Sequence, residues 1–444
     1  PVSEHAYYAS WGYQVTGFYA PSSRYGTPKD FQFLINTLHE ADIGVMIDWV
    51  PAHFPKDKWA LAHFDGTALF EHPDPRRGEH PDWGTAVFNF GRPEVKNYIT
   101  ANAHFWCDVF HVDGLRVDAV SSMLHLDYSR KKGEWTPNIH GGNDNLEAVE
   151  LLRDVNHVVH SEFPGVVTIA EESTDWPKVS RPQSDGGLGF SFKWNMGWMH
   201  DNLDFLREEP VHRKRHFDKT VFAMLYHYNE NFVLPLSHDE VVHLKSSLLG
   251  KMPGDDQQRL ANLRLLFGYQ WTFPGKQLLF MGGELAQADE WSEDRQLDWL
   301  SVGGDSPNRG IQSWVRDLNR LYCAEPALWE ADFKKTGFQW VNCNDRDASV
   351  LSFMRRDKAA ARTLLVVINF ASVSRSGYRV GVPAPGRWKE LLNSDAAMYG
   401  GGSLGNGGDY ETEMQSADDF DQSLLIELPP LTLVIFRPAN LPLQ

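Results

Sequence analysis

Cysteine is scarce in this chain of 444 residues, which contains three: Cys107, Cys323 and Cys343. They are far apart, odd in number and without the spacing of a metal site, which argues against a disulfide framework and favours a reducing, cytoplasmic compartment.

Basic residues are outnumbered, with 42 Lys and Arg against 59 Asp and Glu and a formal net charge of -17. Because no basic cluster stands out against that acidity, we expect neither nucleic-acid binding nor adhesion to an anionic membrane.

Long apolar runs are missing as well. No run approaches the roughly 20 residues of a membrane span, and the first residues lack the charged-then-apolar plan of a signal peptide. The hydrophobic fraction of 42% is that of an ordinary globular chain, long enough for two or three domains. Aromatic residues make up 13%, which is compatible with stacking on a neutral sugar, although most aromatic side chains of any protein lie in its core.

Strand-like and helix-like segments alternate through residues 1–325, with a long excursion at about 53–90 that is rich in His, Pro, Gly and Asp. This alternation predicts an α/β fold with a parallel sheet, here a (β/α)8 TIM barrel. We count seven barrel strands from residue 14 onward, the first at 14–19, whereas the fold closes with eight. The chain begins as if in the loop after a missing first strand, so we expect a piece of a longer protein.

The pattern changes after about Glu325. Short alternating runs, separated by turns and by a Gly-rich stretch at 399–408, fill residues 326–444. Such runs are typical of an antiparallel β-sandwich, which we expect as a C-terminal domain.

A short apolar strand within residues 111–120 carries Arg116 and Asp118. Because strand side chains alternate between two faces, both should project to the same side. A cation beside a carboxyl favours its ionised form and lowers its pKa, which suits a nucleophile or a charged stabiliser. Taken alone, however, such a pair is more often structural.

The same arrangement of an apolar run ending in an acid recurs at Asp48, Glu171 and Asp239. A single acid after a strand most often caps the next helix. Four of them form a pattern that capping does not require, and the carboxyl ends of barrel strands converge on one face. The sequence therefore predicts four acids in one pocket.

The acid-bearing segments resemble the four signature regions of the alpha-amylase superfamily, in the same order: Asp48-Trp-Val-Pro-Ala-His53, Asp113-Gly-Leu-Arg-Val-Asp-Ala-Val120, Ile169-Ala-Glu-Glu-Ser173 and Leu236-Ser-His-Asp-Glu240. Other segments resemble its subfamily of bacterial 1,4-alpha-glucan (glycogen) branching enzymes: Ser10-Trp-Gly-Tyr-Gln14, Ser121-Ser-Met-Leu124, Asp127-Tyr-Ser-Arg130, Ser173-Thr-Asp-Trp-Pro177, Val179-Ser-Arg-Pro182, Lys193-Trp-Asn-Met-Gly-Trp-Met-His-Asp201 and Lys251-Met-Pro-Gly-Asp255. The resemblance covers nearly the whole chain. Members of this subfamily usually carry an N-terminal carbohydrate-binding sandwich, which is lacking here.

The resemblance implies a role for each acid. Asp118 matches the nucleophile and Glu171 the general acid/base, which should hold a proton at rest because nearby negative charges disfavour its ionised form. In a retaining mechanism these two carboxyls should lie about 5 to 5.5 Å apart. Asp239 matches the third acid, the transition-state stabiliser. Glu172, next to Glu171, is expected to be non-catalytic.

The resemblance also implies the residues that hold the sugar. The expected substrate-binding residues are Tyr13, Asp48, His53, Arg116, His238 and Trp176. Tyr13 matches a stacking platform, and we place Trp176 near the acceptor side. One segment, Gly282-Gly-Glu-Leu-Ala-Gln287, departs from the family, which usually has Phe-Gly after the Glu.

The implied reaction cleaves an alpha-1,4 bond of an alpha-glucan such as glycogen or amylose and transfers the chain to a 6-hydroxyl, forming an alpha-1,6 branch. It needs no cofactor and no metal, and we expect a monomer. The acid-bearing motifs do not separate this transfer from hydrolysis. An alpha-amylase-type hydrolase therefore stays open as an alternative, as does a catalytically disabled glucan-binding fragment.

Overall fold

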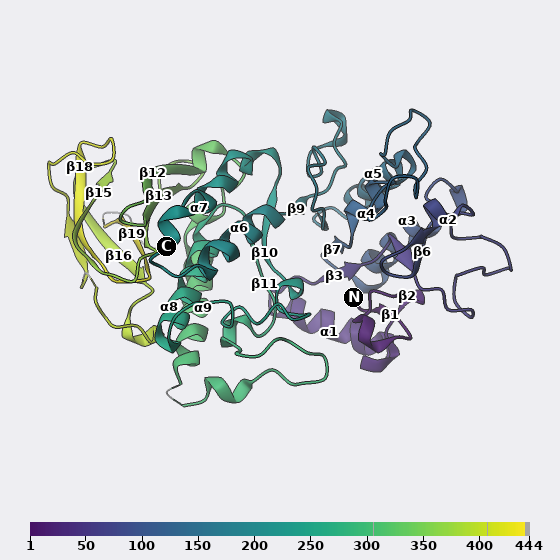
Figure 1. Cartoon of the computed structure of the whole chain (residues 1–444), viewed down its shortest axis with the longest axis horizontal. Coiled ribbons are helices and arrows are strands. Elements are labelled where there is room, and N and C mark those ends of the chain that lie inside the picture. Colours follow the sequence, from purple (N-terminus) through teal and green to yellow (C-terminus); the bar gives the residue numbers. More distant parts are fainter. Residues whose placement is uncertain (305, 406, 440–444) are drawn as a thin grey trace. The chain divides into compact units, whose positions relative to one another are not determined.

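The computed structural model describes residues 1–304, 306–405 and 407–439, which form two compact units (Figure 1). The first unit comprises residues 1–194 with 229–231. The second comprises residues 195–228 and the described residues from 232 onward. Each unit has its own hydrophobic core. The boundary near Glu325 that we expect from the sequence stays a prediction.

Four parallel strands form the sheet of the first unit. In spatial order they are β3 (Met46–Trp49), β7 (Gly114–Val117), β8 (Val167–Ala170) and β9 (Phe192–Trp194). The helices of this unit are α1 (Pro28–Glu40), α2 (Pro75–Gly78), α3 (Pro93–Phe110), α4 (Val120–Leu124) and α5 (Leu146–Glu162). The parallel order confirms the predicted α/β class.

Helices α1 and α5 each begin at a residue whose side chain caps the helix. Thr27 accepts a hydrogen bond from the Asp30 N–H, and the Asp30 carboxylate in turn accepts from the Thr27 N–H, which starts α1. Asn145 caps α5 through the Ala148 N–H. These helices fall where their apolar spacing predicts them, as does α3, and their inner faces join one cluster around Trp49 and Trp106.

The strand that we predict at 14–19 does not join the parallel sheet. The chain forms β2 (Gly17–Pro21), which pairs antiparallel with β1 (Ser3–Glu4) and belongs to a separate two-stranded sheet. Among the described residues, the other six of the seven strands that we expect in the barrel are present and parallel. An apolar alternating run is compatible with either direction of pairing, so the sequence did not distinguish them. The excursion at 53–90 also contains a small sheet, β4 (His53–Phe54), β6 (Thr85–Val87) and β5 (Glu79–His80).

The second unit contains the parallel strands β10 (Phe232–Leu236) and β11 (Lys276–Leu279). Its helices are α6 (Met196–Arg207), α7 (Asp218–Phe222), α8 (Asp256–Thr272) and α9 (Pro307–Ala324). Most of α8 is buried, including Arg264 and Gln270, so its sequence carries little contrast between an inner and an outer face.

The C-terminal part of the second unit is antiparallel, as predicted (Figure 1). One sheet has the order β12 (Phe338–Asp345), β13 (Val350–Arg356), β14 (Thr363–Asn369), β19 (Thr432–Pro438), β16 (Arg387–Asn393) and β17 (Asp409–Glu411). The other pairs β15 (Arg375–Val382) with β18 (Gln422–Leu428). Apolar side chains of both sheets share one core. In the part of the chain that the structure describes, we find no helix long and apolar enough to cross a membrane.

We predict that Asn102→Ala destabilises the protein by about 2 kcal/mol, because it orphans two buried polar groups. Asn102 is buried in α3, where its amide accepts from the Trp49 indole N–H at 2.7 Å and donates to the Phe18 carbonyl at 2.6 Å. Urea unfolding measures the effect. Asn36→Ala, at an exposed position of α1, serves as the matched control, and equal stability of the two variants would contradict the prediction.

Candidate active site

Three carboxylates converge on one guanidinium in the first unit. Arg116 Nη1 lies 2.5 Å from Asp48 Oδ1 and 2.8 Å from Asp118 Oδ1, and Arg116 Nη2 lies 3.0 Å from Glu171 Oε2. Arg116 and Asp118 are therefore on the same side of their strand, as predicted. Among the described residues, no set of three His, Cys, Asp or Glu is arranged to hold a metal ion.

The strand register explains this convergence. In β3 and β7, Asp48 pairs with Arg116, and in β7 and β8, Val117 pairs with Ala170. The ladder continues one residue past the strands, since the Asp118 N–H donates to the Trp49 carbonyl and the Glu171 N–H donates to the Val117 carbonyl. Three adjacent parallel strands thus deliver one acid each to the same end of the sheet.

Aromatic rings enclose the guanidinium. The Trp194 ring centroid lies 4.4 Å from Arg116 Cζ, a cation–π contact, and the Tyr13 ring lies 5.9 Å away. The Tyr13 hydroxyl donates to Asp48 Oδ2 at 2.6 Å. Sequence reasoning missed Trp194, although it lies in one of the segments that carry the subfamily resemblance.

The Glu171 carboxylate is held from two sides. Besides its contact with Arg116, Oε2 accepts a hydrogen bond of 2.8 Å from the backbone N–H of Ala119. Ala119 has a φ of 51°, in the left-handed region that a residue with a Cβ rarely adopts. The strained backbone directly after Asp118 thereby aims a donor at the neighbouring acid.

Burial and shared charge determine the ionisation of the site. Burial raises the pKa of Asp118 well above its usual range; Arg116 opposes this rise, and Glu171 and Asp48 add to it. Burial also raises the pKa of Asp48, but Arg116 and the hydrogen bond from the Tyr13 hydroxyl oppose it, and the net pKa is lowered. Arg116 thus lowers the pKa of Asp118, as expected, but burial outweighs this contribution and the net pKa is raised.

His53 is buried and packs against the buried His80 ring and the exposed Trp83 ring. Its centroid lies 5.0 Å from that of Trp83 and 5.9 Å from that of His80. Burial lowers the pKa of His53 to about 4 and that of His80, with a smaller contribution from the charge of His53, to about 3. Both rings are neutral at pH 7, so each can donate one hydrogen bond and accept another.

Two further predicted positions lie in the loop after β8. Trp176 is partly buried, with its ring 5.4 Å from that of His125. Glu172 is fully buried and its Oε2 lies 2.6 Å from Lys193 Nζ, so it is turned to different partners from those of Glu171.

His238 and Asp239 belong to the second unit. They follow the carboxyl end of β10, with His238 Nε2 3.4 Å from Asp239 Oδ1 and the His238 ring 5.9 Å from that of Phe280. Their membership of one pocket with Asp118 and Glu171 stays a prediction.

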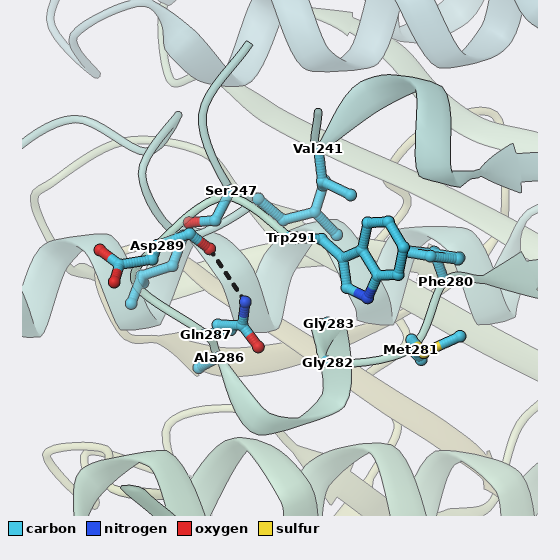
Figure 2. A pocket seen from close by; sticks show the side chains of 12 residues that line it. Val241, Ser247, Phe280, Met281, Gly282, Gly283, Ala286, Gln287, Asp289 and Trp291 are labelled. Atoms are coloured by element: carbon cyan, nitrogen blue, oxygen red, sulfur yellow. Dashed lines mark hydrogen bonds between the residues drawn. The ribbon is translucent and has the colours of Figure 1, made fainter. Parts of the chain in front are cut away.

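A small pocket in the second unit lies beside the loop after β11 (Figure 2). Phe280 and Trp291 form one wall, with ring centroids 5.4 Å apart, and Gln287 donates to the Asp289 carbonyl at 3.2 Å. Ala286 also lines the pocket and has a φ of 51°. The segment that departs from the family pattern therefore places an alanine where the backbone would favour glycine.

Residues 83–370 match the family described as alpha amylase, catalytic domain, and residues 340–439 match alpha amylase, C-terminal all-beta domain. The chain belongs to the alpha-amylase family. Solved structures agree on the fold. The alpha-amylase from Geobacillus thermoleovorans gives a TM-score of 0.70 at 16% identity, covering 98% of this chain and 86% of that chain. The alpha-amylase from H. orenii gives 0.64 at 18% identity, covering 99% and 88%.

Within the family, the chain is similar to curated proteins named 1,4-alpha-glucan branching enzyme GlgB. It is 57% identical to that of Rubrobacter xylanophilus over 99% of this chain and 60% of the relative. It is 56% identical to that of Thiobacillus denitrificans over 99% of this chain and 59% of the relative. The chain thus spans about 60% of the length of the curated relatives that it matches.

We predict that His53→Gln weakens the pH dependence of stability. The pKa of His53 is about 4 in the native state against 6.5 for the free side chain, so between these values the unfolded chain binds a proton that the native protein does not. Stability is therefore lost as pH falls, by about 2 kcal/mol for this group between pH 7 and pH 5.

Urea unfolding at both pH values measures this loss. The variant should lose about 2 kcal/mol less than the wild type, because glutamine does not titrate. An equal loss in both proteins would show that burial does not hold the His53 ring neutral.

Proposed function

We propose that this chain is a 1,4-alpha-glucan branching enzyme that cleaves an alpha-1,4 bond and transfers the released chain to a 6-hydroxyl. The observation that carries the proposal is the identity of 55% to 57% with curated branching enzymes over nearly the whole chain. The clustering of Asp118 and Glu171 on one guanidinium supports the chemistry. The substrate would be an alpha-glucan such as amylose or glycogen.

In the first step, an Asp118 carboxylate oxygen attacks the anomeric carbon while the bond from that carbon to the leaving oxygen breaks. Glu171 gives its proton to the leaving oxygen, which departs as the 4-hydroxyl of the chain end. A covalent glucosyl-enzyme on Asp118 results. Arg116 and the Ala119 N–H support this role, since they fix the Glu171 carboxyl beside the nucleophile.

In the second step, the ionised Glu171 removes a proton from the acceptor hydroxyl. The acceptor oxygen attacks the anomeric carbon from the face that the first chain left, and the bond to Asp118 breaks. Two inversions retain the alpha configuration. A 6-hydroxyl as acceptor gives an alpha-1,6 branch, whereas water gives hydrolysis.

The other residues would bind the sugar and stabilise the transition state. We assign Asp239 as the third acid, because it follows β10 as Asp118 follows β7. We assign His53 and His238 as hydrogen-bonding groups to the sugar, and the neutral state of His53 supports this, since a neutral ring both donates and accepts. Tyr13 would be the platform beneath the same sugar, with Asp48 fixing its hydroxyl.

A cytoplasmic location, a monomeric state and the absence of nucleic-acid or membrane partners belong to the same proposal. The free cysteines support the location, and the net charge of -17 supports the absence of nucleic-acid and anionic membrane partners.

Proton NMR of linear amylose incubated with the chain tests the proposed function, with a reducing-end assay in parallel. We expect a growing alpha-1,6 anomeric signal with nearly constant reducing ends. With Asp118→Asn, which cannot form the covalent intermediate, we expect no alpha-1,6 signal and no new reducing ends. Rising reducing ends without branches would mean a hydrolase. No change in either with the wild type would mean that this chain does not catalyse the reaction.

We predict that Trp176→Ala lowers the number of branches formed per reducing end released, by about 3- to 10-fold. The loss of this ring would leave space for water next to the acceptor. A change of this size in the ratio corresponds to a modest difference in transition-state binding. The same two assays measure the ratio. Trp59→Ala, in the excursion, is the control because Trp59 is highly exposed, and an unchanged ratio in Trp176→Ala would contradict a role on the acceptor side.

A further inference from the structure

Glu172 is a fully buried carboxylate in the loop that follows the general acid/base. Its Oε2 accepts from Lys193 Nζ at 2.6 Å, and its Oε1 accepts from Ser121 Oγ at 2.9 Å and from the Thr174 N–H at 2.8 Å. Burial raises its pKa, but Lys193 and these hydrogen bonds outweigh burial and lower it. The Glu172 carboxylate is therefore ionised, and both of its oxygens accept hydrogen bonds.

The network of this ion pair connects the segments that follow β7 and β8 with the neighbouring strand β9. Ser121 lies in α4, three residues after Asp118; Glu172 directly follows Glu171; and Lys193 lies in β9. Ser121 Oγ also accepts from the Ser173 N–H at 2.9 Å, and Lys193 Nζ donates to the Thr174 carbonyl at 2.9 Å. The segments of the nucleophile and of the acid/base are thus held in one network.

The same network reaches Trp176. Thr174 Oγ1 accepts from the Trp176 N–H at 3.2 Å and contacts His125 Nε2 at 3.2 Å, and the His125 ring packs on the Trp176 ring. The position of this ring therefore depends on Thr174, and that of Thr174 depends on Glu172.

Stability alone does not explain such a pair. The cost of removing two charges from water often exceeds their mutual attraction, and apolar side chains of similar volume commonly serve as well. The ion pair also fixes orientation, because both carboxylate oxygens of Glu172 accept hydrogen bonds and Lys193 Nζ donates to both Glu172 and the Thr174 carbonyl.

We propose that Glu172 and Lys193 are positioning residues that fix the Glu171 carboxyl and the Trp176 loop, and thereby set the ratio of chain transfer to hydrolysis. This inference rests on the proposed branching function. In the second step Glu171 must align with the hydroxyl of a long acceptor chain, which needs a defined orientation. Water is small and reaches a loosened site in many orientations, so disorder at this carboxyl penalises transfer more than hydrolysis.

The test compares Glu172→Gln, Lys193→Met and the double variant E172Q/K193M in the full 444-residue chain. Branches per reducing end and kcat for bond cleavage are measured on amylose, and urea unfolding is measured for each variant. Glu230→Gln is the matched control. Glu230 is another buried carboxylate of the same unit, and it holds the Val179 and Ser180 N–H groups at 2.9 and 2.7 Å, farther along the same loop.

We expect E172Q to lower the ratio of branches to reducing ends about tenfold, with a smaller fall in kcat for cleavage. Each single variant leaves one buried charge without its partner and is destabilised, whereas the double variant regains stability but keeps the low ratio. Glu230→Gln should lose stability without a change in the ratio.

Two results would overturn the inference: a wild-type ratio in the double variant, or an equal fall of the ratio in Glu230→Gln. If the single variants do not fold, the ratios measured for the double variant and for Glu230→Gln still test the inference. A wild-type chain that makes no branches at all would instead refute the proposed function, and the two failures are therefore distinguishable.

Discussion

The shared guanidinium of Arg116 is the interaction on which the rest of the site depends. Asp48, Asp118 and Glu171 each lie within 3.0 Å of it, and three carboxylates so close together would repel one another without a cation. A guanidinium can serve several acids at once, because its donors point in fixed and different directions. The ring of Trp194 and the hydroxyl of Tyr13 complete its surroundings.

This arrangement requires the parallel sheet. Each acid follows a different strand, and the strand register places those three positions side by side. The helices α3 and α5 cover the sheet with a dense apolar core, which fixes the strands and hence the acids. Behind the acids, the network of Glu172 and Lys193 fixes the loops. The acids and Arg116 thus form one layer of the site. The network of Glu172 and Lys193 forms a second layer, which holds the first in place.

Much of this could be read from the sequence, because the relevant rules are local. Side-chain alternation placed Arg116 and Asp118 on one face, and caps and apolar spacing placed α1, α3 and α5. Other features depend on packing between distant segments. The direction of pairing of β2, the burial of α8 and the contact of Trp194 with Arg116 have no local signature. The net rise of the pKa of Asp118 also escaped prediction, since it depends first on burial, which has no local signature in the sequence. The sequence predicts that Glu172 is non-catalytic but does not reveal its ion pair with Lys193, which lies 21 residues away.

The most direct test of this account is to trap the covalent intermediate. A Glu171→Gln variant, which forms the intermediate but is slow to release it, is incubated with an activated fluorinated alpha-glucosyl donor, and the peptides are analysed by mass spectrometry. We expect the sugar to be attached to the peptide that contains Asp118, and specifically to that side chain. Attachment to Asp48, Glu172 or another residue would contradict the assignment of Asp118 as the nucleophile, and so would branching activity that persists in Asp118→Asn.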